Sequence, residues 1–196
     1  MKTHQLEVHG AYKWIGKEAD TLFKCSEIDK QGIYIWTLPI NNQYLTYYVG
    51  ETGTSFGDRF LSHTRGYLDG LYRVYDPEEF AKGNKKLVWE GMWKKELGPT
   101  AQRMHLFLNS YEELSKAIYE MMSTFRIFLF PLKCDRRTRQ RIEASLAKAF
   151  YSQTGLTGSF QDSDIRYAET KSGEEPIEIT FTSNFDIIGL PKKLRC

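Results

Sequence analysis

Two early segments of the chain are built from residues that favour β-strands. Gly32–Leu38 and Tyr44–Val49 are rich in β-branched and aromatic side chains, which fit the pleated surface of a sheet. Between them lie Pro39, Asn41 and Asn42, and these residue types are typical of turns. The pattern predicts a β-hairpin over this region.

Apolar residues recur at helical spacing in two other segments. In the later segment they fall at positions i, i+4, i+7 and i+8, namely Ile142, Leu146, Ala149 and Phe150. This stripe predicts an amphipathic helix from about Asp135 to Gln153, the clearest helix in the chain. The earlier segment, Thr54 to about Leu71, has the same character, with Gly66 and Gly70 as candidate terminators. It is also expected to be a helix.

Four further elements follow from the pattern. We expect Met104–Leu108 to be a short strand and Tyr111–Met122 a helix. Phe125–Leu132 is expected to be a buried strand, and Ile177–Thr182 alternates as a half-exposed strand does. This mixture of helices and strands indicates an α+β fold.

The length of 196 residues favours a single domain. Its core is expected at about 30–153, with an insertion at about 72–119 and an acidic C-terminal extension at 154–196. Within the insertion, Trp89 and Trp93 are spaced to share one helical face and are flanked by lysines. An aromatic and basic DNA contact is one interpretation of this pair, and burial in the core is the favoured one.

The composition is that of an ordinary globular protein, with 41% hydrophobic and 27% charged residues. The longest apolar stretch, Ile127–Leu132, is far shorter than the roughly 20 residues that span a bilayer. Met1–Gly10 lacks the apolar centre of a signal peptide. We therefore expect a cytoplasmic protein with no membrane partner. Its three cysteines contain no CxxC pair, which predicts neither a disulfide framework nor a zinc site.

The charge is small overall, +2, but unevenly distributed. The chain is basic over Lys133–Lys148 and acidic over Phe160–Asp186. The basic segment includes four arginines at the start of the predicted helix: Arg136, Arg137, Arg139 and Arg141. Cations at a helix N-terminus oppose the helix dipole. Solvent and an Asp135 cap would offset this cost, and so would a nucleic-acid phosphate backbone lying across the helix start. The interpretation with a phosphate backbone is slightly favoured, and it makes these arginines candidate nucleic-acid-binding residues.

A set of chemically active residues falls on the predicted elements in a recognisable order. Gly32-Ile33-Tyr34 opens the first hairpin strand, Tyr48-Val49-Gly50 closes the second, Arg59 precedes His63 by one helical turn, and Glu143 lies in the late helix. In these motifs the chain resembles the GIY-YIG nuclease family. The resemblance covers Gly32–Gln153, interrupted at 72–119, and the stretch Arg59–Gly70 is most similar to the homing-endonuclease branch. It implies a small antiparallel β-sheet flanked by helices, with insertions.

The resemblance also implies a DNA endonuclease that depends on Mg²⁺ or Mn²⁺. Glu143 would be the metal ligand, because Mg²⁺ needs only one or two carboxylates and keeps waters at its other positions. Arg59 would hold the scissile phosphate and stabilise its transition state. Tyr34 is the first candidate for the general base, since a metal or Arg59 would lower its pKa. Tyr48 and His63 are competing bases, and the sequence does not rank the three.

Other interpretations remain open. Each of these residues, taken alone, is more commonly a packed or solvated side chain. Many family members have a lysine where this chain has Glu51. They also have an asparagine some way beyond the metal ligand, where this chain offers Gln153 or Gln161 instead. The alternatives are therefore a non-catalytic nucleic-acid-binding domain on the same fold, or cleavage of RNA. Among DNA nucleases a restriction-type enzyme is one interpretation, and a homodimer is an option if both strands are cut.

The hairpin register decides whether the two motif tyrosines can share a site. Side chains alternate between the faces of a strand, so a two-residue turn with regular pairing would place Tyr34 and Tyr48 on opposite faces. A three-residue loop over Ile40–Asn42 would place Tyr34 opposite Tyr48. We therefore predict such an odd loop, or a bulge with the same effect, and both hydroxyl groups directed toward Arg59 and Glu143.

Overall fold

The computed structural model describes residues 2–92, 100–161 and 169–196. It confirms the α+β class. The central sheet has five strands in the order β2-β7-β3-β4-β9. They are β2 (His9–Lys13), β7 (Arg126–Pro131), β3 (Gly32–Ile40), β4 (Gln43–Thr52) and β9 (Ile187–Ile188). A second sheet has the order β1-β8-β10, with β1 (Lys2–Glu7), β8 (Ile177–Thr182) and β10 (Lys193–Arg195).

The sheets are mixed, which corrects the expectation of one small antiparallel sheet. Strands β2, β7, β3 and β4 are antiparallel neighbours, but β9 pairs with β4 in the parallel sense. In the second sheet β8 is parallel to β1 and antiparallel to β10. Both parallel pairings involve the C-terminal extension, and parallel neighbours far apart in the chain leave no local turn signature in the sequence.

The β3–β4 hairpin closes in a tight turn. Ile40 pairs with Gln43, so the turn has Asn41 and Asn42 at its centre, with φ angles of 49° and 63°. Asparagine tolerates this left-handed region, and tight hairpin turns require it. The three-residue loop predicted from the sequence is therefore wrong.

The predicted bulge is present instead. Pairing shifts between Trp36↔Tyr48 and Thr37↔Thr46, which leaves Tyr47 as the extra residue on β4. Beyond the bulge Trp36 lies opposite Tyr48, and Tyr34 lies opposite Gly50. Residues two apart on a strand share a face, so Tyr34 and Tyr48 point to the same side of the sheet.

The central sheet separates two hydrophobic cores, one on each face. On one face the side chains of Tyr34, Trp36 and Leu38 pack against helix α1 (Phe56–Leu68) and helix α4 (Tyr111–Thr124). On the other face Ile33, Ile35 and Val49 pack against helix α5 (Arg136–Tyr151) and the strands of the second sheet. Helices α1 and α5 therefore lie on opposite faces of β3 and β4. Every expected helix or strand outside the insertion agrees with the structure to within a few residues.

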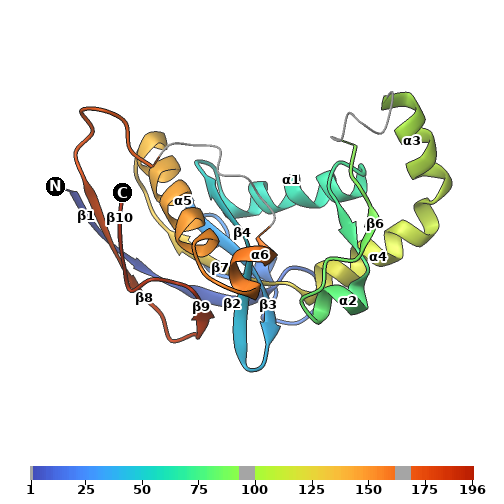
Figure 1. The fold of residues 1–196 in the computed structure, drawn as a ribbon, viewed down its shortest axis with the longest axis horizontal. Helices are drawn as coiled ribbons and strands as arrows, with labels where there is room; N and C mark the ends of the chain where they lie inside the picture. The colour runs from blue at the N-terminus through green and yellow to red at the C-terminus, as the bar shows by residue number, and fades with distance from the viewer. Residues whose placement is uncertain (1, 93–99, 162–168) are drawn as a thin grey trace.

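The insertion and the adjoining part of α4 form one arm of the molecule (Figure 1). Its elements are β5 (Val74–Tyr75), α2 (Pro77–Ala81), β6 (Leu87–Trp89) and α3 (Thr100–Asn109). The strand expected at Met104–Leu108 is wrong, because the segment lies within α3. Arg103 and Phe107, four residues apart, are the buried positions of that helix, whereas Met104, Leu106 and Leu108 are exposed.

Trp89 lies in a strand, so the expected helical alignment of the two tryptophans is wrong. Its indole packs on Phe107, with ring centroids 5.3 Å apart, and its Nε1 donates a hydrogen bond to the Gly70 carbonyl at 2.7 Å. These contacts confirm its packing against the core. Trp93 lies outside the described residues.

The C-terminal extension completes both sheets rather than forming an appendage. After α6 (Leu156–Phe160), strands β8 and β10 build the second sheet and β9 extends the central one. Cys25 and Cys196 are buried, Cys134 is half-buried, and all three are free thiols. Across the described ranges, no helix is long and apolar enough to span a membrane.

Candidate functional site

The phenol of Tyr34 lies at the centre of the residues that the motifs predicted. Tyr34 is fully buried. Its hydroxyl accepts a hydrogen bond from Arg59 Nε at 3.0 Å and lies 2.8 Å from His63 Nε2. Strand β3 supplies the tyrosine, and one face of α1 supplies both partners, which are four residues apart. Side chains from two distant parts of the sequence thus meet at one oxygen atom.

The start of α1 is held in place by local interactions. Ser55 is the N-cap, and its side chain accepts a hydrogen bond from the Asp58 amide at 3.0 Å. Phe56 and Phe60 are buried and anchor the helix on the Tyr34 face of the sheet. Arg59 lies between these two anchors in the sequence, so its guanidinium is directed by a helix that cannot rotate without exposing apolar surface.

Gly50 explains why the second motif ends in glycine. A Cβ atom built at Gly50 would lie 2.3 Å from both Cζ and Oη of Tyr34. The phenol ring therefore crosses the backbone of β4 where a side chain would stand, and any residue other than glycine would displace it. The glycine lets the Tyr34 ring lie close against the backbone of β4, and it places the Tyr34 hydroxyl at the end of the sheet.

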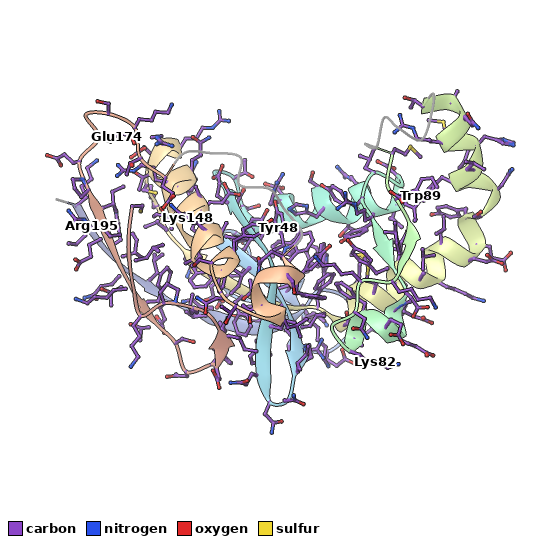
Figure 2. The ribbon with its side chains drawn as sticks, in the orientation of Figure 1. Tyr48, Lys82, Trp89, Lys148, Glu174 and Arg195 are labelled. Carbon is purple, nitrogen blue, oxygen red and sulfur yellow. The ribbon has the colours of Figure 1, made fainter. Side chains whose placement is uncertain are left out.

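Tyr48 lies beside Tyr34 and is more exposed. Its ring centroid is 6.1 Å from that of Tyr34, 4.6 Å from that of Trp36 and 5.9 Å from that of His63. Figure 2 shows Tyr48 near the middle of the molecule, between α5 and α1. It is half-buried, whereas Tyr34 and His63 are shielded from solvent. Of the two motif tyrosines, Tyr48 is therefore the one that a solvent-borne ligand reaches first.

Glu143 reaches the same site from α5. Its side chain is half-buried, and its negative charge contributes to raising the pKa of Tyr34. Because α5 covers the opposite face of the sheet, this influence acts around the end of β4, where Gly50 carries no side chain. Glu143 and Arg59 thus approach Tyr34 from opposite faces of the hairpin.

The protonation states are set mainly by burial. Burial raises the pKa of Tyr34 well above its usual range, with Tyr48 adding to the rise and Arg59 opposing it. Burial also lowers the pKa of His63 to about 3, helped by the Arg59 guanidinium. Arg59 acts on Tyr34 in the expected direction, but desolvation is the larger effect. At neutral pH the phenol and the imidazole are therefore both neutral. In the protein without a bound metal ion, the pKa of Tyr34 is raised, so the expected lowering of this pKa is wrong.

The arginines of α5 do not form one exposed basic face. Arg139 and Arg141 are buried. Arg139 pairs with Glu51 at 2.8 Å and donates to the Cys134 carbonyl at 2.6 Å, and Arg141 donates to the carbonyls of Glu169 and Glu175. This corrects the expectation that both lie on a nucleic-acid surface, since internal acceptors occupy their donors.

Two arginines at the helix start remain nearer to solvent. Arg137 makes a bidentate pair with Glu174, at 2.6 Å from Nε and 2.8 Å from Nη2, near the start of α5 (Figure 2). These bonds lower the pKa of Glu174 to about 2. Arg136 is exposed. The protein's own carboxylates, with the Asp135 cap, therefore offset much of the positive charge at the helix start, which was expected to need an anionic partner. Of the four arginines, Arg136 is the one that stays on the surface.

Both departures from the motif pattern now have a structural account. Glu51, which replaces a lysine, is the partner of Arg139 and links β4 to α5. Gln161 is buried, and its Nε2 donates to the Thr46 carbonyl at 2.8 Å, so it holds α6 against β4. The Gln153 amide donates to the Ala149 carbonyl in its own helix. These bonds give both glutamines local structural roles. Neither glutamine is held in the role that was expected of it, which was to replace the asparagine of the family pattern.

Sequence reasoning missed one residue of the site. The Tyr72 hydroxyl lies 3.3 Å from His63 Nδ1. Tyr72 stands just beyond α1, where the insertion begins, and no motif or periodicity singles it out. Only the fold brings it to the imidazole.

A bound divalent metal would have to rely on few protein ligands. Within residues 2–92, 100–161 and 169–196 there is no group of three or more histidine, cysteine, aspartate or glutamate side chains that could hold a metal ion. One carboxylate completed by waters and substrate oxygens is a donor set that suits Mg²⁺ rather than Zn²⁺. The half-buried carboxylate of Glu143 is consistent with that coordination.

Comparison with protein-family models, with curated proteins and with solved structures finds no match for this chain.

Proposed function

We propose that this chain is a nuclease of the GIY-YIG type that hydrolyses phosphodiester bonds in DNA with the help of Mg²⁺ or Mn²⁺. The observation that carries the proposal is the position of the Tyr34 hydroxyl between Arg59 Nε and His63 Nε2, with the charge of Glu143 acting on the same phenol. These residues were selected from the sequence by motif order and spacing; two of them contact the Tyr34 hydroxyl, and the third acts on it through its charge.

The geometry suits hydrolysis of a phosphodiester. Tyr34 occupies Arg59 Nε, which leaves the Nη atoms of the guanidinium to contact a phosphate. A cation there stabilises the charge that grows on the phosphoryl oxygens in the transition state. Tyr34, held by two hydrogen bonds, would position the attacking water; to accept that water's proton the phenol would first have to lose its own, a change that a bound metal ion would favour. A bound Mg²⁺ on Glu143 would supply Lewis acidity toward the phosphate and the leaving oxygen.

The half-buried Tyr48 is the second phenol of the site. Its ring packs on Trp36 and beside Tyr34, so its position is fixed by the sheet. We assign it a contact with the phosphate backbone, because it is the more accessible of the two tyrosines. Such contacts do not distinguish the sugars, so RNA is a substrate that the assay must include.

A plasmid-nicking assay tests the proposal. We expect nicking with Mg²⁺ or Mn²⁺ and none with a chelator. Arg59→Ala and Glu143→Ala should each reduce the rate by about 100-fold or more. Exposed Arg65 on α1 and exposed Glu120 on α4 provide matched controls, whose alanine variants should nick at the wild-type rate.

The contrary outcomes are also specific. Tight DNA binding without nicking would identify a non-catalytic binding domain, and cleavage of an RNA duplex alone would reassign the substrate. Near-wild-type nicking by Arg59→Ala or Glu143→Ala would overturn the site. Sedimentation of the protein with and without duplex DNA would show whether a homodimer forms.

A further inference from the structure

The imidazole of His63 bridges two phenols. Its Nε2 lies 2.8 Å from the Tyr34 hydroxyl, and its Nδ1 lies 3.3 Å from the Tyr72 hydroxyl. His63 is 3% exposed, whereas Tyr72 is half-buried. The three side chains form a line that leads from the buried centre of the site toward solvent.

Tyr72 is held in this line by close packing on α1. A Cβ atom built at Gly66 would lie 2.4 Å from Cε2 of Tyr72, so the ring rests on the helix backbone at that glycine. The ring of Tyr67 packs against it edge to face, with centroids 5.1 Å apart. The Tyr72 hydroxyl is therefore placed by the surface of the same helix that carries His63.

The tautomer of His63 decides what Tyr34 can do. A neutral imidazole has one N–H donor and one acceptor nitrogen. Arg59 Nε can only donate, so Tyr34 Oη accepts that bond. If His63 Nε2 also donated, the Tyr34 proton would have to point toward the substrate. If Nε2 accepts, the proton points toward His63, and a lone pair of Tyr34 faces the site.

Burial favours the second arrangement. Tyr34 is fully buried, and among the described residues the hydrogen-bond partners of its hydroxyl are Arg59 Nε, a donor, and His63 Nε2. The Tyr34 proton therefore needs Nε2 as its acceptor, since a buried hydroxyl without an acceptor is destabilising. The Tyr72 hydroxyl can give its own proton to water and accept from His63 Nδ1.

We propose that Tyr72 is a positioning residue: by accepting a hydrogen bond from His63 Nδ1 it fixes the tautomer in which Nε2 takes the Tyr34 proton, so that a Tyr34 lone pair is free for the attacking water. The tautomer is a property of the protein alone, and the consequence for catalysis rests on the proposed nuclease function. In metal sites, a partner that orients a ligating imidazole changes activity by about 10- to 100-fold, and we expect an effect of the same order for an imidazole that orients Tyr34.

Nitrogen NMR of the imidazole tests the tautomer directly. With His4, His9 and His105 replaced by Gln, the remaining signals belong to His63. We expect Nδ1 to be protonated in the otherwise wild-type chain, and Tyr72→Phe to raise the Nε2-protonated population. Tyr119→Phe, a change at an exposed tyrosine, is the control and should leave the tautomer unchanged. Protonated Nε2 before the Tyr72 change, or an unaltered tautomer after it, would overturn the proposal.

Kinetics test the consequence. For Tyr72→Phe we expect a single-turnover nicking rate lowered by about 10- to 100-fold, an altered dependence of that rate on pH, and unchanged DNA affinity. Gly66→Ala keeps the hydroxyl but displaces it, and should reproduce the same loss. Thermal unfolding checks that both variants are folded. An unchanged rate and pH profile in Tyr72→Phe would overturn the inference.

Failure of this inference can be told apart from failure of the proposed function. If the wild-type chain does not nick nucleic acid, the nuclease proposal fails, and the NMR experiment still decides the tautomer. If the wild type nicks and Tyr72→Phe nicks equally well, only the role of Tyr72 is wrong.

Discussion

His63 is a buried polar residue whose two ring nitrogens both contact phenol hydroxyls. Its aromatic surroundings, which include Trp14 and Trp36, exclude water, and Arg59 adds a positive charge nearby. Both features oppose the imidazolium form. The imidazole is therefore suited to holding a hydrogen bond in a fixed direction and poorly suited to storing a proton.

This burial predicts acid sensitivity of the fold. The pKa of His63 is about 3 in the folded protein and ~6.5 in an unfolded chain. The unfolded state therefore binds more protons between these values, and stability is lost as the pH falls below ~6.5, by at most about 1.4 kcal/mol per pH unit.

Urea denaturation at pH 7 and pH 4.5 measures this loss. His63→Gln cannot titrate, so its free energy of unfolding should fall less over this interval than that of the wild type. His105→Gln, at an exposed site, should behave like the wild type. Equal pH dependence in all three proteins would contradict the assignment.

Helix α5 is joined to its surroundings by ion pairs that run along its N-terminal half. Arg137 binds Glu174 in the C-terminal extension, and Arg139 binds Glu51 on β4. The second pair is well shielded, with side-chain exposures of 8% and 16%. It connects α5, which carries Glu143, to the strand that carries Gly50 and Tyr48. We infer that the pair sets the distance of Glu143 from the rest of the site.

Reversal of one charge should therefore destabilise the protein. Glu51→Lys introduces the residue common in the GIY-YIG family, but here it would oppose Arg139 in a shielded site. We expect a loss on the order of 3 kcal/mol in the free energy of unfolding. Equilibrium denaturation measures it, and Glu112→Lys, on the exposed face of α4, should cost far less.

A double variant isolates the interaction itself. Glu51→Lys combined with Arg139→Glu restores opposite charges and should recover much of the lost stability. If the double variant is no more stable than Glu51→Lys alone, the pair does not join α5 to β4 in the way described.

At the scale of the whole molecule, the C-terminal extension closes the core on the α5 face. Ile177, Ile179, Phe181 and Ile187 belong to the same hydrophobic cluster as Phe128 and Phe130 of β7 and as the apolar face of α5. The first and last parts of the chain also pair directly, since β1 and β8 are neighbours, and the first and last strands, β1 and β10, lie on that side of the molecule (Figure 1). The extension is therefore part of the fold that holds α5.

Removal of residues 177–196 should prevent stable folding. Those four apolar side chains contribute about 6–12 kcal/mol through burial, which is comparable to the stability of an entire domain. We expect the truncated chain to lack a cooperative thermal transition by circular dichroism. Lys193→Ala, which keeps β10, serves as the control, and a truncated chain that melts cooperatively near the wild-type temperature would refute the prediction.

Local sequence determined the elements whose stability comes from nearby residues. The apolar stripes produced α1 and α5, and the turn residues Asn41 and Asn42 produced the hairpin, because caps, turns and periodicity act over a few positions. Motif order likewise singled out Tyr34, Tyr48, Arg59, His63 and Glu143, which the fold gathers around one phenol.

Tertiary packing decided what depends on distant partners. It placed Tyr72 behind His63, buried Arg139 and Arg141 that the local charge pattern had assigned to a nucleic-acid surface, and added parallel strands from the C-terminal extension. It also raised the pKa of Tyr34 by burial, against the effect expected from Arg59. Desolvation and ion pairing depend on which side chains meet across the whole fold, and a linear pattern does not contain that information.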